Sequence, residues 1–383
     1  MATVRRNPFD YGGPVAGQQF AGRREELRAV SDRMVDHIGI VVTAPRRYGK
    51  SSLIKEACAS LSTKNPAPAI VSVNLLQAGS LATVAGVLLR GLYQVPGGPW
   101  QRLAQTLPGF LQRIRVQPSI TLDPSGRPTF NFLPNMALDD AFKVVTDVYE
   151  ALDKIGEKRP AVLVLDEFQA VDDLSPQLPG LLKALADEHR RVSLVLAGSR
   201  HHMMENLVLL KGAPLHNMLE HFALGPIPED DWIPFLLGAA QRGARPFASK
   251  EIAELLWRSS RPVPFDVQKL AYESFGQANA KIDRGVVARS VEALVRHEES
   301  DFAKNFEKLS PGQRRVLKLL ATGGTASIGS AEFASAADLS DSSAVRKAIN
   351  VLEASELIVS RESGFEVDDP FFAAWLQRPG GAN

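Results

Sequence analysis

The stretch "VVTAPRRYGKSSLIKEA", from Val41 to Ala57, decides the fold of this sequence. It opens with a short β-branched run, passes through a loop that contains proline and glycine, and continues with helical periodicity. A strand, loop and helix in this order can surround a phosphate, because loop N–H groups and the helix N-terminus both attract an anion. Residues Ala44 to Ser51 fit the pattern GxxxxGK[ST], with Ala44 at the first glycine position. The stretch therefore predicts a nucleotide-binding P-loop.

Three residues of this loop have chemical roles that require their residue types. Gly49 lets the backbone approach the ligand closely, Lys50 would reach the β- and γ-phosphates, and Ser51 would ligate Mg²⁺ through its hydroxyl. The plain alternative, a glycine-containing turn with an incidental lysine, does not account for both the strand before and the helix after. The predicted nucleotide contacts in the loop are Pro45, Arg46, Arg47, Tyr48, Gly49, Lys50, Ser51 and Ser52. Arg46 and Arg47 have a second reading, as residues that form salt bridges nearby.

A second part of the site is indicated by "RPAVLVLDEFQ", from Arg159 to Gln169. Four apolar residues lead directly into Asp166 and Glu167, which would lie at the carboxyl end of a strand, where open α/β sheets bind ligands. We expect Asp166 to hold the Mg²⁺ shell and Glu167 to act as the general base that polarises the attacking water. This pair predicts an ATP hydrolase with ATP and Mg²⁺ as its ligands.

The stretch "VSLVLAGSR", from Val192 to Arg200, supplies two more candidates. Ser199 could bridge the γ-phosphate and the water, and its alternative reading is a serine where a strand passes into a loop. Arg200 could stabilise transition-state charge in a neighbouring subunit, and its alternative reading is a surface arginine. Arg200 is the one hint in the sequence of a homo-oligomer with shared sites.

The rest of the chain alternates strand and helix patterns, which predicts an α/β fold with a parallel sheet. Strands are expected at 38–45, 68–75, 159–169, 192–200 and 220–227, with an insertion at 95–135 that carries a hairpin over 119–132. After Pro226 the pattern becomes helical, and three helices with a hairpin at 359–369 form a winged-helix pattern near the C-terminus. The predicted parts are an N-terminal arm (1–19), an ATPase core (20–227), a helical lid (228–300) and a winged helix (301–383).

Composition limits the class of protein. The chain has 383 residues, a formal net charge of +1 and one cysteine, so no disulfide framework holds it together. Its apolar runs are strand-sized and its first residues contain no apolar signal segment, so we expect a cytoplasmic protein with no membrane partner.

Several stretches taken together resemble the archaeal-type AAA+/STAND ATPases, which are related to origin-recognition and replication-initiator ATPases. The stretches are "FAGRREEL", "APRRYGKSSLI", "LVLDEFQ", "LAGSRHHMM", "LGPI" and "VDDPFFAAWL", so the resemblance spans Phe20 to Leu376. It implies a P-loop core, a helical lid and a winged helix, with ATP and Mg²⁺ as ligands. It also implies that Phe20, Gly22 and Arg23 help to cradle the adenine and that Pro264 in the lid faces the nucleotide.

Two departures from this family bear on hydrolysis. Where many relatives have an arginine ahead of the fifth strand, this sequence has His216, Asn217 and Met218. Where relatives have Gly-x-Pro in the lid, it reads Pro262-Val263-Pro264, and Arg261 is the nearest lid arginine. These departures leave nucleotide binding intact and predict slow turnover, as in a nucleotide-held switch.

The winged helix leaves two functional hypotheses open. The exposed face of its third helix would present residues suited to phosphates and base edges, namely Ser342, Ser343, Arg346, Lys347 and Asn350, which predicts double-stranded DNA as a partner. Against this, Lys308 to Arg378 contain eight basic and nine acidic residues, whereas DNA-binding domains usually carry a basic surface. The alternative is a STAND-like signalling or scaffold ATPase whose winged helix contacts a protein.

Overall fold

The computed structural model describes residues 6–95, 118–122, 128–132, 137–199, 204–323, 328–361 and 364–378. The chain divides into two compact units. The first, called the core unit here, is Pro14–Pro226; the second, the C-terminal unit, joins Met1–Gly13 to Ile227–Asn383. The chain therefore passes between the units at two places, and the first of them, at Gly13–Pro14, lies within the predicted arm.

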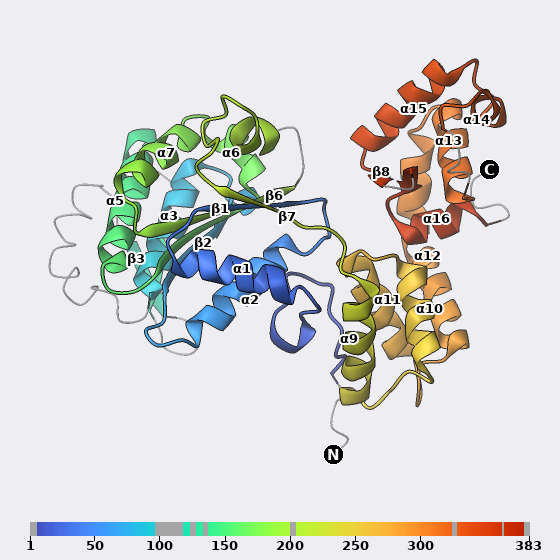
Figure 1. Ribbon diagram of the computed structural model, residues 1–383, viewed down its shortest axis with the longest axis horizontal. Helices are drawn as coiled ribbons and strands as arrows, with labels where there is room; N and C mark the ends of the chain where they lie inside the picture. Colours follow the sequence, from blue (N-terminus) through green and yellow to red (C-terminus); the bar gives the residue numbers. More distant parts are fainter. Residues whose placement is uncertain are drawn as a thin grey trace. The chain divides into compact units, whose positions relative to one another are not determined.

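A parallel sheet forms the centre of the core unit (Figure 1). In the described part of the chain it has five strands in the order β2-β5-β6-β1-β7. They are β1 (Ile40–Ala44), β2 (Ala69–Asn74), β5 (Ala161–Asp166), β6 (Val192–Ser199) and β7 (Glu220–Ala223). Every residue of β1 and β6 is buried, as expected for parallel strands that are covered on both faces. The order places β6 between the P-loop strand β1 and the acidic strand β5.

Helices cover both faces of this sheet. On one face lie α1 (Arg24–Val35) and α2 (Lys50–Ser62), and on the other lie α3 (Leu81–Gln94), α5 (Leu138–Gly156) and α7 (Leu178–Glu188) (Figure 1). Shorter helical segments connect them: η1 (Gly17–Gln19), η2 (Leu75–Gln77), η3 (Phe168–Ala170), α6 (Val171–Leu174) and η4 (Glu205–Leu209). This is a three-layer α/β architecture, in agreement with the fold class expected from the sequence.

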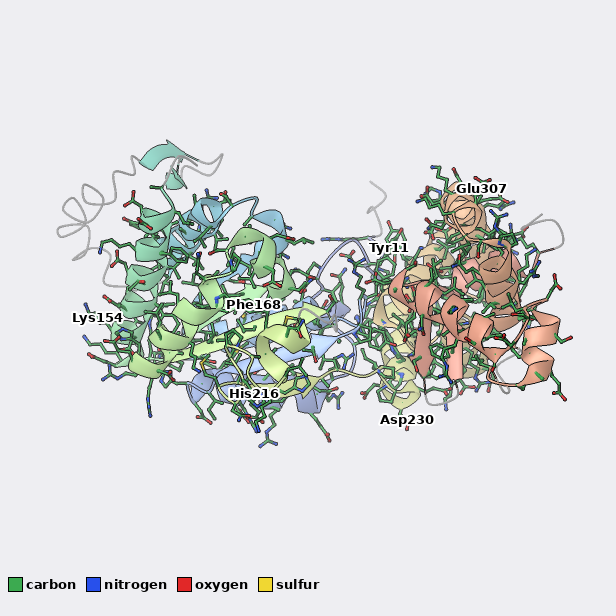
Figure 2. All side chains as sticks on the ribbon, turned by 90° about the horizontal axis from the view of Figure 1, so that it is seen from above. Tyr11, Lys154, Phe168, His216, Asp230 and Glu307 are labelled. Atoms are coloured by element: carbon green, nitrogen blue, oxygen red, sulfur yellow. The ribbon has the colours of Figure 1, made fainter. Side chains whose placement is uncertain are left out.

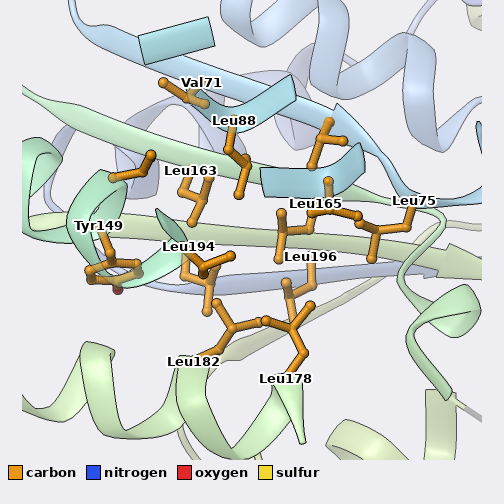
Figure 3. Packing of buried hydrophobic residues seen from close by; sticks show 14 of the residues in the cluster. Val71, Leu75, Leu88, Tyr149, Leu163, Leu165, Leu178, Leu182, Leu194 and Leu196 are labelled. Atoms are coloured by element: carbon orange, nitrogen blue, oxygen red, sulfur yellow. The ribbon is translucent and has the colours of Figure 1, made fainter. Parts of the chain in front are cut away.

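The larger of the two helix layers packs on the sheet through leucines. Leu163 and Leu165 of β5 and Leu194 and Leu196 of β6 meet side chains from α3, α5 and α7, including Leu88, Tyr149 and Leu182 (Figure 3). All seven are at most 1% exposed, and truncating a buried leucine of this kind to alanine costs about 2–5 kcal/mol. The packing therefore fixes the two strands whose carboxyl ends carry the candidate site residues.

Two further strands, β3 (Pro118–Leu122) and β4 (Pro128–Phe132), pair antiparallel at the place where the sequence predicts a hairpin. They lie within the predicted insertion at 95–135, most of which is outside the described residues.

The first part of the C-terminal unit consists of helices. They are α9 (Glu229–Arg242), α10 (Lys250–Ser260), α11 (Pro264–Gln277) and α12 (Arg284–Glu307). Residues from the chain's N-terminal segment pack on them: the Phe9 ring is 1% exposed and makes edge contacts with Phe235 and Phe275, and the Tyr11 ring does so with Phe265. Phe9 of the predicted arm is thus part of a hydrophobic core.

The winged helix follows without a break, because α12 continues past residue 301. It comprises α13 (Pro311–Ala321), α14 (Ala331–Ala336), α15 (Ser342–Ala354), β8 (Ile358–Arg361), β9 (Gly364–Val367) and α16 (Pro370–Leu376). Phe302 of α12 stacks on Phe372 of α16, with ring centroids 5.1 Å apart, and Trp375 lies against both rings. The C-terminal part of α12 therefore contributes to the aromatic core of the winged helix.

In the core unit, apolar side chains form the buried core and most charged side chains lie at the surface. Phe168, immediately after the acidic pair, is fully buried inside the core unit, whereas Lys154 at the end of α5 is exposed at its surface (Figure 2). Among the described residues, no helix combines the length and the apolar character that crossing a bilayer requires.

Candidate functional site

The carboxyl ends of the central strands bring the candidate residues to one edge of the sheet. In the strand register, Ala44 at the end of β1 pairs with Ser199 at the end of β6, and Asp166 at the end of β5 pairs with Asn74 of β2. Parallel strands end together, so side chains far apart in the sequence meet at this edge.

The P-loop connects β1 to α2 in the conformation that the sequence pattern requires. Gly49, which directly precedes the first helical residue, has φ of 84°, a left-handed value that glycine adopts without steric cost. Arg47 also has a positive φ, of 68°, which is unusual for a residue with a side chain. The loop thus turns its backbone sharply before α2, whose N-terminal N–H groups then face the edge of the sheet.

Lys50 lies at the base of this loop and is 6% exposed. Its ammonium donates hydrogen bonds to the carbonyls of Ala44 at 3.2 Å and Pro45 at 3.4 Å. Burial lowers the pKa of Lys50, while Glu167 and Asp166 oppose that shift by attracting its charge. The ammonium is thus bonded to the loop and attracted by the charge of the two carboxylates.

Ser51 and Asp166 lie close enough for the Ser51 hydroxyl to lower the pKa of the Asp166 carboxyl. Burial raises the pKa of Asp166, and the Ser51 hydroxyl and the N–H of Glu167 both oppose this shift. A hydroxyl and a carboxylate side by side are oxygen ligands of the kind that Mg²⁺ takes from a protein when phosphates supply the remainder. The residues therefore fit a Mg²⁺–nucleotide ligand.

Glu167 has a left-handed backbone, with φ of 55° and ψ of 46°. Its N–H donates to Asp166 Oδ1 at 2.9 Å, and its carboxylate accepts a hydrogen bond from the side-chain amide of Gln169. Gln169 ends the stretch "DEFQ", and its residue type alone indicates no role. The available signal was its position two residues after the predicted general base.

Ser199 is 5% exposed and ends β6 beside Ala44, next to the first residues of the P-loop. Arg200 lies outside the described residues, so its proposed action on a neighbouring subunit stays a prediction.

Arg23 has a more specific position than the sequence suggested. Its backbone has φ of 57°, its side chain is buried, and one guanidinium nitrogen donates to the carbonyls of Tyr48 at 2.9 Å and Gly225 at 2.7 Å. Its other terminal nitrogen pairs with Glu26 at 3.1 Å. Arg23 therefore ties the P-loop to the segment after β7, and its predicted contact with adenine stays a prediction.

We expect Arg23→Ala to destabilise the core unit. The change leaves the Tyr48 and Gly225 carbonyls without a buried donor, which costs about 2–3 kcal/mol. The midpoint of thermal unfolding should fall by about 5 °C or more. Arg24→Ala, at the exposed neighbouring position, is the control and should change the midpoint little. Equal midpoints for the two variants would contradict this role.

The remaining predicted contacts occupy different environments. Ser52 accepts a hydrogen bond at 3.1 Å from the N–H of Val15, and Arg46 is exposed while Arg47 is half-buried. Phe20 and Gly22 precede α1 and are half-buried, and Gly22 has φ of 58°. Pro264 is the first residue of α11 and belongs to the C-terminal unit, so its position toward the nucleotide stays a prediction.

The lid arginine nearest to Pro264, Arg261, contacts the winged helix. Arg261 has φ of 60°, donates a hydrogen bond to the carbonyl of Val367 and lies 3.5 Å from a carboxylate oxygen of Glu366, both in β9. A cavity of about 360 Å³ beside it is lined by residues of the lid and the winged helix, among them Trp257 and Leu320.

The third helix of the winged helix, α15, has one buried and one exposed face. Val345, Ile349 and Leu352 are buried. The residues predicted to meet DNA are all exposed: Ser342, Ser343, Arg346, Lys347 and Asn350. In the hairpin that follows, the guanidinium of Arg361 is 3.5 Å from the carboxylate of Glu366. The same carboxylate also forms an ion pair with Arg261.

The chain is similar to a winged-helix family model in its C-terminal part and to solved ATPase structures over nearly its whole length. A family model described as "Probable winged helix domain" matches residues 300–378. The Walker-type ATPase PABY2304 of Pyrococcus abyssi is 16% identical and superposes over 97% of this chain and 100% of that one, with a TM-score of 0.63. Aeropyrum pernix ORC2 in its ADP form is 14% identical over 97% and 98% of the two chains, with a TM-score of 0.54. Aeropyrum pernix ORC1, solved in complex with DNA, is 14% identical over 96% and 94%, with a TM-score of 0.51.

No significant match is found among curated proteins. At the identities above, the likeness to solved structures establishes the fold. It confirms the fold class expected from the sequence, a parallel P-loop sheet with a C-terminal winged helix, and the structural resemblance to archaeal ATPases of the Walker and ORC kind.

Proposed function

From the fold that this chain shares with archaeal P-loop ATPases, we propose that it binds ATP with Mg²⁺, hydrolyses it slowly, and acts as a nucleotide-controlled switch coupled to double-stranded DNA. One observation carries the proposal: the P-loop and the acidic pair lie at the same carboxyl edge of the sheet, close enough that Ser51 and Lys50 both lower the pKa of Asp166. A phosphate-binding turn and a metal-binding carboxylate are thereby joined in one site.

Binding is assigned to the P-loop and the residues around it. The N–H groups at the start of α2 would receive the phosphates, and the ammonium of Lys50 would exchange its two carbonyl partners for phosphate oxygens. Ser51 and Asp166 would hold Mg²⁺, which when bound neutralises charge on the phosphates. Phosphate oxygens and water would supply the other ligands of the Mg²⁺ shell.

Hydrolysis is assigned to Glu167, which would accept a proton from the attacking water, with Ser199 near the γ-phosphate. Slow turnover follows from the absence of an arginine at His216, Asn217 and Met218. It is also supported by Arg261, whose guanidinium is already bonded to β9 of the winged helix.

Coupling to the winged helix is supported inside the C-terminal unit. Helix α12 runs through both the lid and the winged helix, and Arg261 joins the lid to β9, three residues before Pro264. A change in the lid would therefore be carried to the winged helix. A nucleotide shifts such an equilibrium only if it binds the two states with different affinity.

DNA is proposed as the partner of α15. Its exposed face offers two cations and three small polar side chains, which suit phosphate oxygens and base edges in a major groove. The related fold of Aeropyrum pernix ORC1, a protein solved in complex with DNA, supports the same assignment.

A protein partner is the second candidate. It is favoured by Glu366, which lies within 3.5 Å of both Arg261 and Arg361 and so reduces the positive charge of the hairpin. With eight basic and nine acidic residues between Lys308 and Arg378, the winged helix lacks an overall basic surface.

Salt dependence of duplex binding distinguishes the two candidates. We expect the affinity for duplex DNA to fall as salt rises, and the double variant Arg346→Glu/Lys347→Glu to reduce the slope of log K against log salt by about 2. The control Lys281→Glu/Arg284→Glu changes the same charge at exposed positions elsewhere in the C-terminal unit and should keep the slope. Binding without a salt slope, or identical slopes for the two variants, would favour a protein partner.

Turnover with and without duplex DNA tests the switch. Coupling predicts that the steady-state rate of ATP hydrolysis rises when DNA is added. A rate that is indifferent to DNA, in a protein that binds ATP, would contradict the coupling.

A further inference from the structure

Gln169 lies two residues after Glu167, and neither the sequence nor the proposed function gives it a role. Its side-chain amide donates a hydrogen bond to Glu167 Oε2. A carboxylate can only accept, so the amide nitrogen must be the end that faces Glu167. The other end, Oε1, is buried and has no hydrogen-bond partner among the described residues. The Gln169 side chain is therefore oriented with its amide nitrogen toward the carboxylate of Glu167.

Backbone conformation explains why these two side chains meet. Glu167 has a left-handed backbone and is followed at once by the short helix η3, Phe168–Ala170. Phe168 is fully buried and anchors this turn in the core. The turn therefore brings Gln169 back toward Glu167, and the pair is held by a fixed piece of backbone.

The opposite side of Gln169 faces β6. A Cβ atom added to Gly198 would lie 2.7 Å from Gln169 Oε1 and 2.6 Å from Met204 Sδ, closer than such atoms approach one another in proteins. Gly198 is the residue before Ser199, at the carboxyl end of the strand between β1 and β5. The absence of a side chain at Gly198 leaves the space that the Gln169 amide occupies.

We propose that Gln169 is a positioning residue for Glu167, resting on the proposed function of Glu167 as general base. The amide fixes the direction of the carboxylate, and Gly198 fixes the place of the amide. An apolar side chain of the same length would fill the space equally well and would leave no buried acceptor without a partner, so packing alone does not explain a glutamine here. Gln169 acts on the reaction through Glu167.

Gln169→Met tests this, since methionine keeps the length and loses the donor. We expect kcat for ATP to fall roughly tenfold, the loss typical of a hydrogen bond to a charged group, with KM changed less than about twofold. In the Glu167→Gln background the same change should have no further effect on turnover. Gln241→Met, at an exposed position of α9, is the control. An unchanged or increased kcat in Gln169→Met would overturn the proposal.

Gly198→Ala tests it without altering Gln169. The added methyl group should displace the amide and lower kcat in the same way, again with little change in KM. Gly180→Ala is the matched control, because a Cβ at Gly180 meets nothing within 4 Å. A kcat for Gly198→Ala equal to that of Gly180→Ala would contradict the role of this contact.

A readout without nucleotide separates this proposal from the proposed function. If Gln169 holds Glu167, the shifts in thermal midpoint caused by Glu167→Ala and Gln169→Ala should not add, and the double variant should unfold close to the less stable single variant. Additive shifts would overturn the positioning role whether or not the protein hydrolyses ATP. If the shifts of the variants do not add and the wild-type protein does not hydrolyse ATP, the Gln169–Glu167 contact is supported and the proposed hydrolysis is rejected.

Discussion

Replacing Glu167 by glutamine is expected to lower the rate of ATP hydrolysis by about 10²–10⁴-fold, the contribution that a positioned general base usually makes. Glutamine has nearly the same shape but cannot accept the proton of the attacking water. Glu167 is next to Asp166, and neither Asp166 nor Ser51 is altered, so the substitution changes the base and leaves the proposed Mg²⁺ ligands in place. Nucleotide affinity should therefore remain within a few-fold of the wild-type value.

The measurement is steady-state release of phosphate, together with a titration of fluorescent ATP analogue. Glu188→Gln, an exposed glutamate at the end of α7, is the control and should keep the wild-type rate. Equal rates for wild type and Glu167→Gln would mean that Glu167 is not the base. A loss of affinity that matches the loss of rate would mean that it serves binding instead.

The second large effect is expected for Lys50→Met, which should weaken ATP binding about 100-fold or more, because the variant loses a charge that would face the phosphates. Lys50 is 6% exposed, and its ammonium is held by two loop carbonyls close to Asp166 and Glu167. Methionine fills the same space without the charge, so the fold should persist.

Lys183→Met, at an exposed position of α7, removes the same charge away from the site and is the control. Affinity is measured by titration and folding by circular dichroism. Wild-type affinity in Lys50→Met would contradict the assignment of the P-loop. Loss of the folded state in Lys50→Met would show that the lysine serves the structure of the loop.

The local sequence pattern was sufficient to predict the strands, the turn and the helices that carry the candidate site residues. The β-branched run that ends at Ala44 and the glycine at position 49 predict a strand, a turn and a helix from neighbouring residues alone, and the structure has β1, a left-handed Gly49 and α2 there. The same holds for Asp166, which ends an apolar strand, and for the buried and exposed faces of α15.

Contacts between segments that are far apart in the sequence could not be predicted from the local sequence pattern. The contact of Arg23 with adenine stays a prediction, whereas the bonds of its guanidinium to the backbone carbonyls of Tyr48 and Gly225 could not be foreseen, because every residue carries such groups. Arg261 was considered as a lid arginine, yet it meets β9 of the winged helix. The N-terminal segment was expected as an arm, yet Phe9 is buried among lid helices.

The sequence by itself therefore determined the order of elements, the P-loop, the acidic pair and the winged helix, because periodicity and turn chemistry act over a few residues. Only the tertiary structure decided that β6 lies between β1 and β5, that Ser51 reaches Asp166, and that Gln169 fits between Glu167 and Gly198. These relations depend on which strands pair and on how closely side chains pack, and both are set by the burial of apolar surface over the whole core unit.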